Sequence, residues 1–64
     1  MEDLNAQGGV LIGLIDEKGV FGGLRRQGDE WVCVLWENGI ARGFGGDTFI
    51  EAVQKAADAA GVSL

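Results

Sequence analysis

The chain has 64 residues, 47% of them hydrophobic and 12 of them glycine, a size that permits one small domain of marginal stability. Ten acidic and five basic side chains give a net charge of −5, which disfavours direct binding to nucleic acid and favours a basic protein partner. The longest apolar run, over residues 10–15, is too short to cross a bilayer. The acidic start lacks the cationic and apolar regions of a signal peptide, so we expect a cytoplasmic protein that does not bind membranes.

The beginning of the chain predicts a flexible arm, followed by a single domain over residues 9–64. Residues 1–8 carry polar groups, show no sustained periodicity and run into a glycine pair. Residues 10–15 are rich in β-branched side chains and apolar on both faces, which predicts a first strand. The polar segment Asp16–Gly19 places a glycine where a hairpin turn needs it.

Three more strands are expected in the middle of the chain. Residues 20–26 predict the second strand, in which the pair Gly22-Gly23 favours a β-bulge. Residues 30–37 show the strongest strand pattern because β-branched and aromatic side chains dominate them. Asn38-Gly39 is the preferred pair for a type I′ turn, and residues 40–44 alternate well enough for a short fourth strand.

The remaining segment predicts a helix that begins at Phe49. Thr48 and Glu51 have the spacing of a capping box, and apolar side chains then recur every three or four residues along one face. Gly61 supplies the left-handed residue that commonly ends a helix. The expected fold is therefore α+β, an antiparallel four-stranded β-β-β-β-α sheet with one C-terminal helix packed on one face.

One helix covers one face of such a sheet, so the second face needs another partner. Trp31 and Trp36 have opposite parity in their strand and should point to opposite sides. One of them is therefore a candidate interface anchor, because large exposed aromatic side chains mark contact surfaces. The alternative is that the N-terminal arm or a bulge covers the second tryptophan.

Arginines on the predicted strands are further interface candidates. Arginine suits interfaces because its planar guanidinium pairs with carboxylates and stacks on aromatic rings. Ordinary salt bridges to Glu30 or Glu37 are the alternative interpretation. The predicted partner-binding residues are Trp31, Trp36, Arg25, Arg26, Arg42 and Phe44.

Catalytic, metal and cofactor sites are not predicted. Cys33 is the single cysteine and should pack as a small hydrophobe, and without histidine a zinc site lacks its usual ligands. The glycines at 43–46 precede a helix start, but Asp47 and Glu51 occupy the end of the helix where a phosphate would bind. Carboxylate pairs fall in exposed turns, so we expect a non-enzymatic protein; an active site would have to form across a subunit boundary.

Residues 31–61 resemble the HicB-like antitoxin domain. The resemblance lies in a strand, a turn and a glycine-containing strand before a helix that opens with Gly46-Asp47-Thr48 and continues with Glu51-Ala52. The segment is also similar to small phage-encoded domains in which tryptophan-containing strands precede a Gly-x-Thr-x-x-x-Ala helix start. Both resemblances imply an inhibitor from a bacterial or phage-infected cell, such as an antitoxin or an anti-CRISPR protein.

The expected function is that of a small acidic binding protein, with no cofactor, that occludes the site of a basic nucleic-acid-handling protein. Within this hypothesis the carboxylates either mimic nucleic-acid phosphates, which predicts strong salt dependence, or surround an interface centred on Trp31, Trp36 and Phe44. The chain is also a candidate homodimer. The alternative function is a structural, homo-oligomerising module without inhibitory activity.

Overall fold

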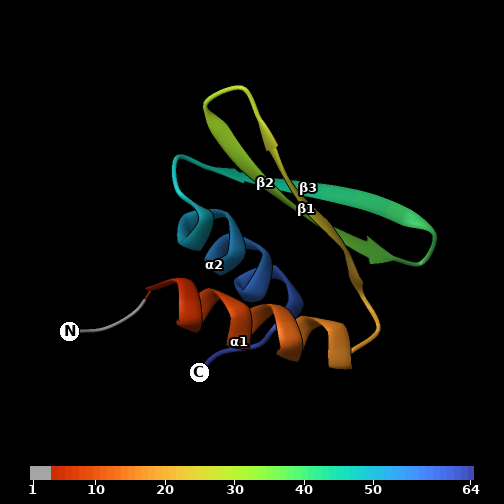
Figure 1. Ribbon diagram of the computed structural model, residues 1–64. Coiled ribbons are helices and arrows are strands. Elements are labelled where there is room, and N and C mark those ends of the chain that lie inside the picture. Colours follow the sequence, from red (N-terminus) through yellow and green to blue (C-terminus); the bar gives the residue numbers. More distant parts are fainter. Residues whose placement is uncertain (1–3) are drawn as a thin grey trace.

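A three-stranded antiparallel sheet is covered on one face by two helices (Figure 1). The computed structural model describes residues 4–64. Its strands follow the order β1-β2-β3, so both β1 and β3 are edge strands. The elements are α1 Leu4–Glu17, β1 Phe21–Gln27, β2 Glu30–Glu37, β3 Ile40–Gly46 and α2 Phe49–Ala60.

The prediction of a first strand over residues 10–15, and with it the four-stranded β-β-β-β-α fold, is wrong. These residues belong to α1, and the observed order is α-β-β-β-α. A short apolar run fits a buried helix as well as a strand, and its packing decides between them. Leu11 and Ile15 are four residues apart and are 4% and 0% exposed, so the run buries a helical face. Of the expected arm over residues 1–8, residues 4–8 form the start of α1, and residues 1–3 lie outside the described residues.

Helix α1 lies against α2, and at Gly8 its backbone comes close to the side chain of Phe49. A Cβ atom added at Gly8 would overlap the ring of Phe49, the first residue of α2. Glycine inside a helix costs about 1 kcal/mol relative to alanine, which lowers the helical propensity of α1. Gly8 is buried, so this cost is offset by packing that a larger residue would prevent.

The connections within the sheet agree with the sequence patterns. The β2–β3 turn has positive φ at both Asn38 (55°) and Gly39 (78°), as a type I′ turn requires. The predicted bulge is confirmed, because the β1–β2 register shifts between Phe21 and Gly23, and Gly23 has a φ of 146°. The strand predicted over residues 40–44 extends two residues further and ends at Gly46.

The predicted C-terminal helix is confirmed with its caps. The Thr48 hydroxyl accepts from the Glu51 amide at 3.2 Å, as a capping box requires, whereas the Glu51 carboxylate accepts from the amide of Asp47, the residue before the cap, at 3.3 Å. Gly61 ends the helix with a φ of 76°, and the Val62 amide donates to the Ala57 carbonyl at 3.0 Å. These bonds satisfy backbone groups at both ends of α2.

The hydrophobic core lies between the helix layer and the odd-numbered side chains of β2. Each of the two helices and the central strand contributes residues that are almost fully buried: Leu11, Ile15, Cys33, Leu35, Ala52, Val53, Ala56 and Ala57. The predicted packing of Cys33 is confirmed by its 0% exposure, and burial raises the pKa of its thiol above the ordinary value of 9.0. The thiol is therefore neutral at pH 7 and poorly nucleophilic.

Replacement of Gly8 by alanine should lower the free energy of unfolding by about 1–3 kcal/mol, because the added methyl group forces Phe49 away from α1. Gly13→Ala is the matched control, since a Cβ there meets nothing within 4 Å and the change should raise stability by up to about 1 kcal/mol. Urea denaturation measures both variants. Equal stability of the two variants would contradict the packing of α1 on α2.

Stability should also fall above about pH 9 through Cys33. The unfolded chain ionises this thiol near its ordinary pKa of 9.0, whereas the folded chain keeps it neutral to a higher pH. The contribution of the neutral, buried thiol to the free energy of unfolding is thus complete below about pH 9. It is lost as the pH rises through the pKa of the folded state. Cys33→Ala should lower stability at pH 7 yet show a smaller further loss between pH 8 and about pH 10.5, measured by urea denaturation at each pH. The same loss of stability at high pH in the wild type and in Cys33→Ala would show that the thiol does not cause it.

Candidate binding surface on the open face of the sheet

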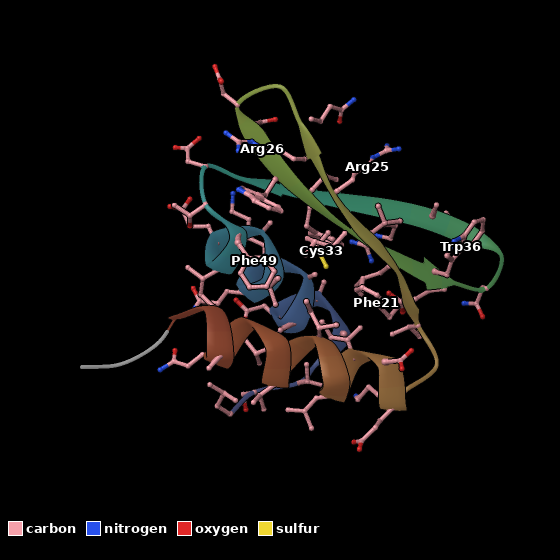
Figure 2. All side chains as sticks on the ribbon, viewed as in Figure 1. Phe21, Arg25, Arg26, Cys33, Trp36 and Phe49 are labelled. Carbon is pink, nitrogen blue, oxygen red and sulfur yellow. The ribbon has the colours of Figure 1, made fainter. Side chains whose placement is uncertain are left out.

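The two faces of the sheet have different surroundings because side chains of β2 alternate between them. Trp31 lies on the face towards the helices, where its ring meets Phe49 edge-on with centroids 5.8 Å apart. Trp36 lies on the other face and is 49% exposed. Figure 2 places Trp36 at the far end of the sheet, away from the helices, and the Cys33 sulfur between the two layers.

We call the second face the open face, because no helix or strand described over residues 4–64 packs on it. The predicted opposite orientation of the two tryptophans is confirmed, and Trp36 is the exposed one. The bulge brings Gly22 against its ring without covering it. The register, together with the approach of Gly22 to Trp36, places the following residues on the open face: Gly22, Gly23, Arg25, Gln27, Glu30, Val32, Val34, Trp36, Ala41, Gly43 and Gly45.

Glycines on β1 and β3 make β2 a ridge along this face. A Cβ at Gly22 would lie 2.6 Å from Cδ1 of Trp36, and one at Gly43 would lie 3.3 Å from Cγ1 of Val32. The Trp36 ring therefore lies over β1, while Val32 lies towards β3. Beside the ridge is a groove of about 370 Å³, lined by Gly22, Gly23, Leu24, Arg25, Val34, Trp36 and Ala41.

Arg25 is the cation of the open face. It pairs across the ladder with Val32, and its exposed side chain forms no ion pair, hydrogen bond or ring contact within residues 4–64. Both lysines donate to carbonyl oxygens, Lys18 to Ala60 at 3.0 Å and Lys55 to Gly45 at 2.7 Å. Arg25 is thus available to a carboxylate from outside its own chain.

The other predicted partner-binding residues lie on the face towards the helices. Arg26 sits 5.8 Å from the centre of the Trp31 ring. Arg42 lies 5.3 Å from the centre of the Phe44 ring and 3.8 Å from a carboxylate oxygen of Glu37, which matches the salt-bridge alternative. The six candidates therefore form no single surface: Arg25 and Trp36 share the open face, and the other four form two cation–ring pairs.

Several open-face residues were missing from the sequence-based set. Val32, Val34 and Glu30 share the parity of Trp36, so strand alternation would have selected them once Trp36 was known to be exposed. The bordering glycines carry no comparable signal, because sequence alone does not show which neighbouring side chain lies over them. Arg25 and Arg26 were grouped because they are adjacent, although adjacent strand residues point to opposite faces.

The open face provides apolar contact area, one guanidinium, one carboxylate and the carboxamide of Gln27. Over residues 4–64, no group of three or more histidine, cysteine, aspartate or glutamate side chains is arranged to hold a metal ion. A second groove of about 380 Å³ runs beside the helices and the end of the chain, and is lined by Leu11, Gln54, Ala57, Asp58, Val62, Ser63 and Leu64. No helix in the described part of the chain is long and apolar enough to span a membrane.

Comparison of the chain with protein-family models, with curated proteins and with solved structures gives no match. A functional assignment therefore depends on the sequence, geometry and charge of the chain itself.

The two tryptophans should respond differently to substitution. Trp31→Ala removes the packing against Phe49 and should cost about 2 kcal/mol of unfolding free energy, whereas Trp36→Ala should stay within about 0.5 kcal/mol. In dilute solution, acrylamide should quench the fluorescence of Trp31→Phe, which retains Trp36, more strongly than that of Trp36→Phe. Equal quenching would contradict the assignment of the open face.

Proposed function

We propose that this chain is a small acidic binding protein that inhibits a nucleic-acid-handling protein by occluding its basic site. One observation carries the proposal: among the side-chain carboxylates of residues 4–64, only that of Glu37 has an ion-pair partner. The others are exposed to solvent and belong to Asp16, Glu17, Asp29, Glu30, Asp47, Glu51 and Asp58. Uncompensated charge of one sign attracts a surface of the opposite sign over a distance of several ångströms.

Three of these carboxylates lie at the same end of the sheet. Trp31 pairs with Gly46, so the β1–β2 turn with Asp29 and the segment that leads into α2 are at the same end of the sheet. We call Asp29, Asp47 and Glu51 the acidic end. Glu51 accepts the hydrogen bond from the Asp47 amide, which orders part of the acidic end before any partner binds.

Occlusion of a basic site fits these features better than catalysis does. An acidic protein is attracted to the positive surfaces that bind nucleic acid. This attraction raises the rate at which the two proteins associate. The resemblance of residues 31–61 to the HicB-like antitoxin domain and to small phage-encoded domains supports the same class of inhibitor. Phosphate mimicry by the acidic end is the form of inhibition that the uncompensated carboxylates favour.

The proposal is tested by capture of the tagged protein from bacterial or phage-infected lysate, identification by mass spectrometry and measurement with the purified partner. A basic nucleic-acid-handling protein should be recovered, and its activity should fall when this chain is added in equimolar amount. Asp29→Asn/Asp47→Asn should weaken binding about tenfold or more, and raising the salt concentration should weaken binding of the wild type steeply.

Asp16→Asn/Asp58→Asn is the matched control, with the same change of net charge away from the acidic end. Both positions lie near the C-terminal end of a helix, where a negative charge is unfavourable, so the control should fold at least as well as the wild type. Equal loss of affinity in both double variants would show that net charge alone matters. Binding that is insensitive to salt would rule out phosphate mimicry.

A further inference from the structure

We infer that the open face docks on the open face of a second copy of the chain, about a two-fold axis parallel to β2. This homodimer goes beyond the proposed function, because it uses a surface other than the acidic end. Three features of the sheet support it. These are the shape of the ridge on the open face, the positions of the charged residues Arg25 and Glu30, and the poor suitability of both sheet edges for strand addition.

The shape of the open face is complementary to itself under this rotation. A two-fold axis along β2 places β1 of one copy opposite β3 of the other. The Trp36 ring lies over β1, beside Gly22, and no atom of it comes within 4 Å of a Cβ added at Gly43. Each ring therefore faces the low surface that Ala41 and Gly43 form on β3 of the other copy. Burial of the ring in this position removes the largest exposed aromatic surface of the sheet from water.

The same rotation brings the positive charge of one open face opposite the negative charge of the other. Arg25 and Gly45 pair with Val32 from opposite sides of β2, so the axis places Arg25 of one copy opposite Gly45 of the other. The Glu30 carboxylate lies over Gly45, with Oε2 3.7 Å from a Cβ added there. Each Arg25 thus meets the Glu30 of the second copy, and the dimer gains two symmetric ion pairs.

The net charge of the chain favours this face over the rest of the surface. Arg25 and Glu30 make the open face neutral, whereas the whole chain carries −5. Two copies therefore approach with least repulsion through their open faces. Packed antiparallel sheets cross at about −30° because each sheet is twisted, and a two-fold axis close to the direction of β2 produces such an aligned arrangement.

Both edges of the sheet are poorly suited to strand addition, which is the other common way for sheets to associate. Lys55 donates to the Gly45 carbonyl at 2.7 Å and occupies a backbone acceptor of β3. The bulge at Gly22-Gly23 interrupts the regular ladder of β1. Face-to-face contact is thus the mode of self-association that the sheet permits.

The size of the face sets the expected affinity. Three strands of seven or eight residues present roughly 350 Å² of flat sheet, against about 800 Å² per partner in a stable protein–protein interface. The dimer should accordingly be weak, with a dissociation constant of about 10–500 μM.

Sedimentation equilibrium of the isolated, full chain between about 10 μM and 2 mM tests the inference. The mean mass should rise from 6.7 kDa towards twice that value. Arg25→Glu alone and Glu30→Arg alone should remain monomeric, because each places like charges opposite one another in the dimer. An equimolar mixture of the two variants should dimerise, because in the mixed pair every position 25 again faces a residue of opposite charge at position 30.

Arg26→Glu is the matched control, since it makes the same change of charge at the neighbouring residue on the face towards the helices, and it should dimerise as the wild type does. Circular dichroism confirms that each variant is folded. A wild type that stays at 6.7 kDa up to about 2 mM, a mixture that remains monomeric, or equal disruption by Arg26→Glu would each overturn the inference. None of these results depends on the inhibited partner, so failure here is distinct from failure of the proposed function.

Discussion

The packing of α1 against α2 is the contact on which the rest of the architecture depends. Gly8 lets the backbone of α1 approach the Phe49 ring, and the same ring meets Trp31 of β2 edge-on. Both helices consequently lie on one side of the sheet, where α1 completes the core with Leu11 and Ile15. Strand alternation then sends Trp36 to the opposite side, so the exposure of the open face follows from the way in which the helices pack.

The central strand contributes to both faces of the sheet. Its odd-numbered side chains, including the fully buried Cys33 and Leu35, form the floor of the core, and its even-numbered side chains form the ridge. This alternation of β2 and its neighbours explains why Arg26 and Arg42, which are exposed on the helix side of the sheet, do not join Arg25. Arg26 and Arg42 are adjacent to open-face positions in sequence yet interact with Trp31 and Phe44 on the other side.

Local signals in the sequence correctly predict the middle and the end of the chain. Asn38-Gly39 and Gly61 adopt positive φ angles that few other residues tolerate, and Thr48 with Glu51 supplies side chains that bond amides at a helix start, so the turn and both helix caps are recognisable. The first helix was missed because apolar residues on all sides, interrupted by glycines, resemble a buried strand. The spacing of Leu4, Leu11 and Ile15 is a helical signal, but it becomes persuasive only when the packing of α2 is known. Likewise, strand alternation shows from the sequence that Trp31 and Trp36 lie on opposite faces of the sheet. Which of the two is exposed depends on the face that the helices cover, and this is known only from the structure.

Two neighbouring glycines at the end of β3 differ sharply in the space that surrounds them. A side chain added at Gly45 would meet only the end of the Glu30 side chain, at 3.7 Å, and would leave the core untouched. At Gly46, one residue further, an added Cβ would lie 2.7 Å from the amide nitrogen of Ala52, a backbone atom that cannot move without shifting α2. A larger residue at Gly45 would therefore reshape the surface opposite Arg25 of a second copy without disturbing the core, whereas any side chain at Gly46 would displace α2.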